Sequence, residues 1–271
     1  MSIDLTRFCI NRKIAPTLSI KEFFQLVQRI GLNKVELRND MWSGKVCDDL
    51  TYKQMQDLIT KYNIEVITIN ALYPFNRVDE SVLKKAEGLL QDAKAINAKA
   101  LVMCPLNEGV DITAEETLAS IKTLEICFAQ YGVNGLVEPL GFPTSSMRSA
   151  VKTQQLINEA HSSFKLVIDT FHHHIYDNAE QNFSTAIDVN VIGLVHISGV
   201  EDTRATAKLT DEERVMLSNR DVLNSVAQIK RLEVLGYKGI YAFEPFSSQL
   251  NSWKAVEIER QINHSIHLLQ A

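Results

Sequence analysis

Residues 135–171 read GLVEPLGFPTSSMRSAVKTQQLINEAHSSFKLVIDTF, in which a polar segment of helical length separates two apolar runs, GLVEPL and KLVIDTF. Short, nearly continuous apolar runs are typical of parallel strands that are buried on both faces of a sheet. The stretch therefore predicts a strand, a helix and a second parallel strand, which is the repeating unit of an α/β fold.

Six further runs of the same kind occur along the chain. They are FCIN (8–11), KVELR (34–38), VITINAL (66–72), ALVMCPL (100–106), LVHISGV (194–200) and GIYAFEP (239–245). Eight strand–helix units in 271 residues predict a (β/α)₈ barrel that occupies residues 1–271 as a single domain. A doubly wound sheet is the alternative, but FCINRKIAP (8–16) lacks the glycines of a phosphate-binding loop.

Four capping-box patterns mark where helices are expected to begin. They are Ser19/Glu22, Thr51/Gln54, Thr113/Glu116 and Thr210/Glu213. The last of them lies in a long polar segment, residues 201–221. A long segment after a barrel strand lies on the catalytic face, so we expect a lid or a substrate loop, with a solvated surface decoration as the alternative.

The composition disfavours several classes of protein. The chain carries 28 Lys and Arg against 33 Asp and Glu, a net charge of −5, so it lacks the basic surplus that nucleic-acid binding needs. No apolar stretch reaches the ~20 residues of a membrane span, and MSIDLTRF (1–8) does not resemble a signal peptide. We therefore expect a cytoplasmic protein with no nucleic-acid or membrane partner. Cys9 and Cys104 are expected to be small buried apolar side chains.

Charged or imidazole groups interrupt four of the apolar runs near their carboxyl ends, where a barrel places its chemistry. These groups are Glu138, Asp169, His196 and Glu244. A buried carboxylate must be paired, hydrogen-bonded or bound to a metal, because an uncompensated buried charge costs several kcal/mol. Proline after Glu138 and after Glu244 favours extended backbone at the end of each strand.

Three carboxylates and one imidazole form an oxygen-rich donor set, which suits a divalent cation such as Mn²⁺, Mg²⁺, Co²⁺ or Zn²⁺. The alternative is structural: Asp169 would cap a turn and His196 would be a hydrogen-bonded core histidine. His172 lies three residues after Asp169, where it could orient a substrate hydroxyl or move a proton.

Several motifs resemble the xylose-isomerase-like barrel superfamily, and within it the 2-keto-myo-inositol isomerase (inosose isomerase) branch. The similar stretches are KVELR (34–38), NALYPFN (70–76), LVIDTFHHH (166–174), LTDEERV (209–215) and LGYKGIYAFEPF (235–246). NALYPFN and LTDEERV are signals of the branch, whereas the four-residue constellation is shared by the superfamily.

The resemblance implies a metal-dependent isomerase or epimerase of a sugar or keto-inositol. The ion, with Mn²⁺ as the first choice, would be bound by Glu138, Asp169, His196 and Glu244. Glu138 and Glu244 would transfer a proton through a cis-enediolate. His172 would line the substrate pocket, and we assign Asn70 to substrate binding as well. A role in inositol or carbohydrate catabolism and a homodimer follow from the same resemblance.

Three positions and one stretch depart from the pattern of that branch. The stretch is MLSNR (216–220), which stands where the branch has Trp-Pro-Gly-x-Gly. Phe142 stands where the branch has His, Ser198 where it has Asp, and Ser247 where it has a substrate-binding Arg. The missing Arg and the absent phosphate loop favour an unphosphorylated substrate.

Three other functions are weighed against this one. An inosose dehydratase-type lyase would begin with the same proton abstraction, and a non-catalytic sugar-binding barrel would keep the fold with an altered pocket. An apurinic endonuclease of the same superfamily would need histidines from early strands. The first of the seven histidines here is His161, which disfavours that chemistry.

Overall fold

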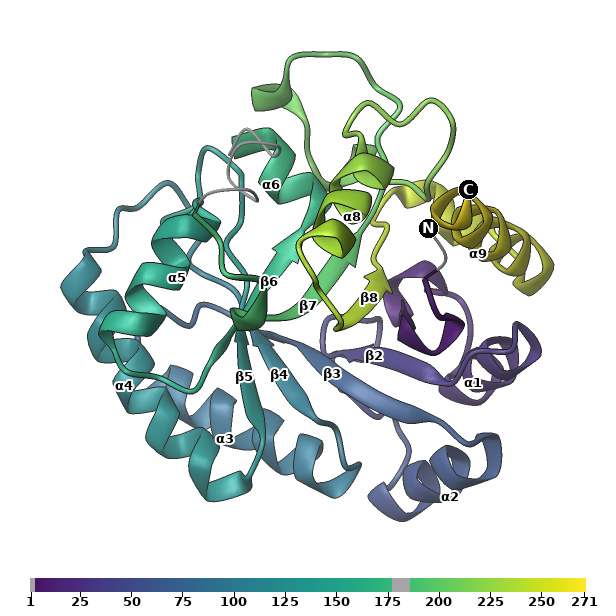
Figure 1. Ribbon diagram of the computed structural model, residues 1–271. Coiled ribbons are helices and arrows are strands. Elements are labelled where there is room, and N and C mark those ends of the chain that lie inside the picture. The colour runs from purple at the N-terminus through teal and green to yellow at the C-terminus, as the bar shows by residue number, and fades with distance from the viewer. Residues whose placement is uncertain (1–2, 177–185) are drawn as a thin grey trace.

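Eight parallel strands form a closed barrel in the computed structural model, which describes residues 3–176 and 186–271 (Figure 1). The strands are β1 (Phe8–Asn11), β2 (Lys34–Arg38), β3 (Glu65–Leu72), β4 (Ala100–Met103), β5 (Asn134–Val137), β6 (Lys165–Asp169), β7 (Ile192–Ile197) and β8 (Ile240–Phe243). Each of the eight predicted apolar runs overlaps one strand, so the predicted (β/α)₈ fold is confirmed.

Helices surround the barrel (Figure 1). They are α1 (Ile20–Arg29), α2 (Tyr52–Tyr62), α3 (Glu80–Ala95), α4 (Ala114–Tyr131), α5 (Ala150–Glu159), α6 (Thr170–Tyr176), α8 (Ser225–Val234) and α9 (Ala255–Gln270). All four predicted capping boxes form, although the one at Thr210 begins only a 3₁₀ turn. Within the described ranges, no helix combines the length and apolarity that crossing a bilayer requires.

Thr113 is expected to stabilise α4 through its capping box. Thr113→Ala removes the hydroxyl that accepts a hydrogen bond from the Glu116 amide at 3.1 Å. We expect the free energy of unfolding to fall by about 1 kcal/mol, measured by urea denaturation. Thr123→Ala, on the exposed side of the same helix, is the control, and an equal loss there would contradict the capping role.

The inward side of the barrel is apolar in its middle and polar at its carboxyl end. A buried apolar cluster includes Val102, Leu136, Val167, Leu194 and Ala242. Two positions further along the same segments stand Cys104, Glu138, Asp169, His196 and Glu244. Because side chains alternate across a strand with a period of two, these five residues point to the same side as the apolar cluster, one layer nearer the carboxyl end.

The barrel closes between its first and last strands. Phe8 pairs with Tyr241 and Ile10 with Phe243. The ends of the chain lie together (Figure 1), and the Gln270 side chain donates a hydrogen bond to the Ile3 carbonyl at 2.6 Å. Residues from both ends of the sequence can therefore contribute to one site.

The polar segment 201–221 connects β7 to α8 and reaches the carboxyl end of the barrel. Its backbone is joined to the end of β7, because Gly199 and Val215 exchange two hydrogen bonds of 2.8 Å. The residue before Val215 is Arg214, whose side chain is fully buried. The segment is therefore more than a solvated surface decoration.

Candidate metal centre

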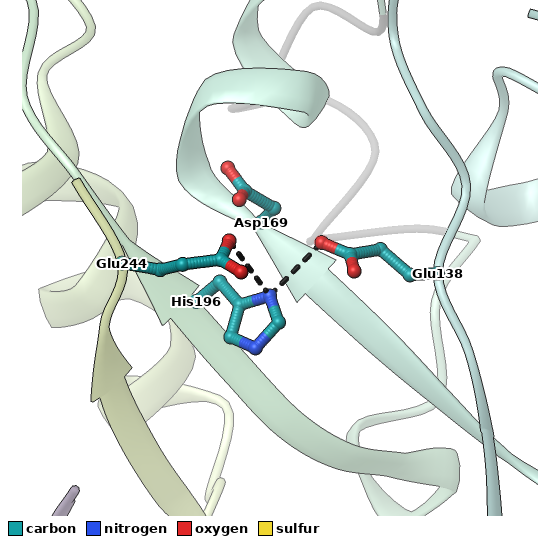
Figure 2. A group of neighbouring side chains, drawn as sticks. All are labelled: Glu138, Asp169, His196 and Glu244. Carbon is teal, nitrogen blue, oxygen red and sulfur yellow. Dashed lines mark hydrogen bonds and ion pairs between the residues drawn. The ribbon is translucent and has the colours of Figure 1, made fainter. Parts of the chain in front are cut away.

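Four side chains meet at the carboxyl end of the barrel (Figure 2). One donor atom of each lies within 4.8 Å of the other three, and all four residues are buried: Glu138, Asp169, His196 and Glu244. The strand register explains the meeting, because Asp169 pairs with His196 across β6 and β7, and Glu244 directly follows β8. The structure thus brings together the four residues that were predicted from strand ends.

His196 is held by carboxylates at both ring nitrogens. Nδ1 lies 2.9 Å from Glu138 Oε1 and 3.3 Å from Glu244 Oε2, whereas Nε2 lies 3.1 Å from Glu36 Oε2. When Nε2 donates its hydrogen to Glu36, the lone pair of Nδ1 faces Glu138 and Glu244. A carboxylate behind the imidazole is the usual arrangement for a histidine that binds a metal through its other nitrogen.

Glu36 is itself fixed by its strand neighbours. It is fully buried in β2, where the register places Asn11 of β1 on one side and Thr68 of β3 on the other. The Asn11 amide and the Thr68 hydroxyl each donate a hydrogen bond to the Glu36 carboxylate. Glu36 therefore has little freedom to turn away from His196.

The two oxygens of Glu244 have different partners. Oε1 accepts hydrogen bonds from Arg38 Nη1 at 2.7 Å and from the side-chain amides of Asn70 and Asn11, both at 3.1 Å. Oε2 faces His196 Nδ1 and accepts a hydrogen bond from Arg214 Nη2 at 2.9 Å. Asn70, which was predicted to bind substrate, thus holds Glu244 directly and also lines the cavity described below.

Asp169 is anchored by the backbone that follows it. Oδ1 accepts the amide hydrogens of Phe171 at 2.7 Å and of His172 at 3.3 Å, in the first turn of α6. Oδ2 accepts a hydrogen bond from Arg214 Nη2. The predicted turn-capping role of Asp169 is therefore present together with its place in the cluster.

Glu138 has fewer partners than the other carboxylates. Apart from His196, its one described hydrogen-bond donor is Cys104, whose sulfur lies 3.7 Å from Oε2. The expectation that Cys104 is a small buried apolar side chain holds in part: the residue packs against the apolar cluster, but it is only partly buried and lines the cavity beside Glu138. Cys9, by contrast, is fully buried as expected.

The buried charges around the cluster do not balance by themselves. Four buried carboxylates and two buried guanidinium groups give a formal charge of −2 when all six are ionised and His196 is neutral, which is the form that binds a metal: Glu36, Glu138, Asp169, Glu244, Arg38 and Arg214. A divalent cation carries the charge that would neutralise this set. Three oxygen donors and one imidazole nitrogen also suit such an ion, so the residues present fit the metal that was expected.

The pKa values show the same imbalance. Burial raises the pKa of Asp169 to about 7 against the opposing charge of Arg214, and burial also raises the pKa of Glu138. Burial alone would lower the pKa of His196, but the surrounding carboxylates, Glu244 foremost, raise it well above its ordinary value. Burial would raise the pKa of Glu244, yet His196 and the nearby arginines lower it. The cluster therefore favours added positive charge.

A cavity of about 400 Å³ opens onto the cluster. Its lining includes Arg38, Asn70, Cys104, Glu138, Leu140, Phe142, His172, Arg214, Glu244 and Phe246. A larger groove of about 960 Å³ lies between residues 44–52 and α3, but it contains none of the four cluster residues. We take the smaller cavity as the candidate substrate site because, of these two, it is the one whose lining includes members of the cluster, Glu138 and Glu244.

His172 lines the cavity and packs between aromatic rings. Its ring centroid lies 4.9 Å from that of Phe142 and 5.3 Å from that of Phe171, both edge to face. Its Nδ1 is buried and has no hydrogen-bond partner among residues 3–176 and 186–271. Gly141 allows this arrangement, because a Cβ atom there would lie 2.2 Å from the His172 carbonyl oxygen.

The other two positions that depart from the branch pattern, Ser198 and Ser247, each make a hydrogen bond to a residue of the segment 201–221. The Ser198 hydroxyl accepts a hydrogen bond from Arg214 Nε at 3.3 Å. The Ser247 hydroxyl donates one to Glu212 at 3.3 Å. Both serines are buried, so each is part of the packing around the cavity rather than a free surface side chain.

The sequence did not single out Glu36, Arg38 or Arg214, although each contacts the cluster. Glu36 and Arg38 lie in KVELR, and Arg214 lies in LTDEERV. Both motifs carried the family resemblance, but neither one marked these side chains as members of the site. The available signal was the alternation in KVELR, where charged residues occupy every second position of a strand that must be buried.

A family model described as xylose isomerase-like TIM barrel matches residues 24–271. The chain belongs to this family. It is 24% identical over 263 residues to an inosose isomerase of Bacillus velezensis, covering 93% of this chain and 92% of that protein. This is a distant homology, and it agrees with the resemblance carried by the sequence motifs.

Two solved structures of the xylose isomerase-like family resemble this barrel. A xylose isomerase domain containing protein from Salmonella typhimurium LT2 is 60% identical, with a TM-score of 0.98 and complete coverage of both chains. The IolI protein with a bound zinc atom is 22% identical, with a TM-score of 0.87, and the match covers 97% of this chain and 98% of that one. The family is one of sugar isomerases and epimerases, and the buried cluster here resembles a metal site.

Proposed function

We propose that this protein is a divalent-metal-dependent isomerase or epimerase that acts on an unphosphorylated sugar or keto-inositol. The observation that carries the proposal is the buried group of three carboxylates and one imidazole at the base of a cavity of about 400 Å³. The ligands would be Glu138, Asp169, His196 and Glu244, with Mn²⁺ as the ion that we would test first and Zn²⁺, Mg²⁺ and Co²⁺ as alternatives.

Glu138 is the candidate base. A bound divalent ion would supply positive charge that stabilises the oxyanion formed when a proton leaves the carbon next to a carbonyl. Glu138 accepts fewer hydrogen bonds than Glu244, and a carboxylate with fewer donors holds a proton more readily. Glu138 would take the proton from the hydroxyl-bearing carbon and later release it to solvent. Glu244 would deliver a proton to the adjacent carbon after first taking one up from solvent.

His172 and Asn70 are proposed to position the substrate. His172 lines the cavity, and its buried Nδ1 atom has no partner in the part of the chain that the structure describes. Such an atom is costly unless a ligand or water satisfies it. Asn70 has a second amide hydrogen besides the one given to Glu244, so it can also donate to a substrate oxygen.

The pairing of the two arginines in the cavity lining supports an uncharged substrate. Arg38 pairs with Glu244 and Asp40, and Arg214 pairs with Asp169, Glu244 and Asp211. The third cation of the lining, Lys85, is exposed and donates a hydrogen bond to the Tyr73 carbonyl at 2.7 Å. A phosphate would have to compete with these carboxylates for a guanidinium group. Leu140, Phe142 and Phe246 add apolar surface that suits the C–H face of a sugar or cyclitol ring.

Proton exchange in heavy water tests the proposal. The protein is loaded with Mn²⁺ and incubated with 2-keto-myo-inositol, fructose and tagatose, and the proton spectrum of each compound is followed. We expect loss of the signal next to the carbonyl in one of them, together with about one metal ion per chain. Exchange followed by loss of a hydroxyl would identify a dehydratase, whereas bound metal without exchange of any compound would contradict an isomerase of these sugars.

We also expect a homodimer, located in the cytoplasm, that takes a small sugar or cyclitol and neither nucleic acid nor membrane. A place in inositol or carbohydrate catabolism would follow from the substrate. Light scattering coupled to size-exclusion chromatography measures the oligomeric state.

A further inference from the structure

Arg214 is a cation built into the cluster. Its Nη2 atom donates a hydrogen bond to Asp169 Oδ2 and another, of 2.9 Å, to Glu244 Oε2, and its side chain is 2% exposed. We propose that Arg214 is a resident counter-cation that competes with the divalent ion for these two carboxylates and so sets the affinity of the metal site. The inference rests on the part of the proposed function that assigns a metal to this cluster.

The guanidinium group is held in place from several sides. Nη1 lies 3.0 Å from Asp211 Oδ1, Nε donates to the Ser198 hydroxyl, and the group stacks 4.4 Å from the centre of the Phe246 ring. The Arg214 carbonyl accepts the amide hydrogens of Phe246 and Ser247, both at 2.9 Å. The backbone at residue 214 is thus fixed independently of the side chain, so a substitution there should leave the segment in place.

The two oxygens that Arg214 contacts are the ones that face the cluster. Glu244 Oε2 is also 3.3 Å from His196 Nδ1, and the other oxygen of Glu244 is already bound by Arg38, Asn70 and Asn11. Asp169 Oδ2 is the oxygen left over after Oδ1 accepts two backbone amide hydrogens. An ion bound to these residues would therefore share both oxygens with Arg214.

This geometry fixes the sign of the effect of removing Arg214. A residue that contacts the side of a ligand facing away from the metal orients that ligand, and its loss weakens metal binding. Arg214 acts on the inward-facing oxygens, and Asp169 and Glu244 keep their outer anchors without it. Removing Arg214 therefore removes a like charge and a competitor from beside the metal, so metal binding should become tighter.

The test compares metal-stripped wild-type protein with Arg214→Met by calorimetric titration with MnCl₂. We expect Arg214→Met to bind Mn²⁺ at least about tenfold more tightly than wild type. The variant should also unfold at a lower temperature without metal and gain more in melting temperature on adding Mn²⁺, because the metal then replaces the missing cation. Arg214→Lys keeps the positive charge, but an ammonium group cannot bridge the Asp169 and Glu244 oxygens as the guanidinium group does. The Mn²⁺ affinity of Arg214→Lys should therefore lie between those of wild type and Arg214→Met.

Arg12→Met is the matched control. Arg12 is fully buried and paired with Asp48, but its described contacts include none of the four cluster residues. The Arg12→Met substitution should lower the melting temperature of the protein without changing its Mn²⁺ affinity. Recovery of folded Arg214→Met only in the presence of Mn²⁺ would support the inference. If Arg214→Met does not fold under any condition, the Mn²⁺ affinity of Arg214→Lys is compared with that of wild type instead. Unchanged or weaker Mn²⁺ binding in both Arg214 variants would overturn the inference alone, whereas a wild-type protein that binds no metal would overturn the metal site as well.

Discussion

Glu138→Gln should reduce the rate of substrate proton exchange by about 10³-fold or more, even when the variant is saturated with Mn²⁺. The amide has nearly the same shape as the carboxylate and can still offer an oxygen to a metal, but it cannot accept a proton from carbon. Exchange in heavy water on the compound that the wild type turns over measures the loss.

The outcome separates a base from a ligand. If Glu138 serves only to bind metal, raising the Mn²⁺ concentration should restore exchange in Glu138→Gln. Glu159→Gln, which makes the same chemical change at the exposed end of α5, should exchange at the wild-type rate. Exchange above about a tenth of the wild-type rate in saturated Glu138→Gln would rule out Glu138 as the main base.

Glu36→Gln should weaken Mn²⁺ binding by about 10- to 100-fold, although Glu36 is not among the four ligands. Glu36 Oε2 lies 3.1 Å from His196 Nε2 and is the group that keeps the hydrogen on that nitrogen. A glutamine there is neutral and can present its amide hydrogens to the imidazole, which would favour the tautomer that blocks Nδ1. Calorimetric titration with MnCl₂ measures the affinity.

Glu65→Gln provides the comparison for Glu36→Gln. Glu65 begins the neighbouring strand β3, where it pairs with Lys34 at 3.1 Å, at the opposite end of the barrel from the cluster. Its substitution should leave Mn²⁺ affinity unchanged. Glu36→Gln is expected to weaken Mn²⁺ binding and Arg214→Met to strengthen it. Glu36 contacts the ring nitrogen of His196 that points away from the cluster, whereas Arg214 contacts the oxygens of Asp169 and Glu244 that face it. The two variants together therefore test whether the side of the ligand that is contacted decides the sign of the change in Mn²⁺ affinity.

Strand positions could be predicted because every strand of this barrel is buried on both sides, which leaves an apolar run in the sequence. The same property made Glu138, Asp169, His196 and Glu244 recognisable in the sequence, because a single charged or imidazole residue stands out in an apolar run. Glu36 and Arg38 in KVELR could not be recognised as interior residues for the opposite reason. The alternation in KVELR resembles a half-exposed strand, and only barrel closure turns the Glu36 and Arg38 side into an interior.

Arg214 could not be found from local sequence. It lies in a segment rich in charged residues, and nothing in the spacing distinguishes it from Glu212, which is exposed. Its burial depends on where the segment folds back, which is set by the bonds between Gly199 and Val215 and by those to the end of β8. Tertiary contacts of this kind leave no periodic signal.

The seam between β1 and β8 also bears on the order in which the molecule is assembled. The ion pair between Arg38 and Glu244 joins residues 206 positions apart, and Asn11 contacts Glu244 across 233 positions. In a growing chain Glu138, Asp169 and His196 are made before Glu244, so the group of four is complete only after β8 has joined the barrel. An ion that needs all four residues would therefore bind late and would not guide the earlier strands to their places. Such an ion would instead tie together the carboxyl ends of β5, β6, β7 and β8, and it would slow unfolding of the finished barrel more than it speeds folding.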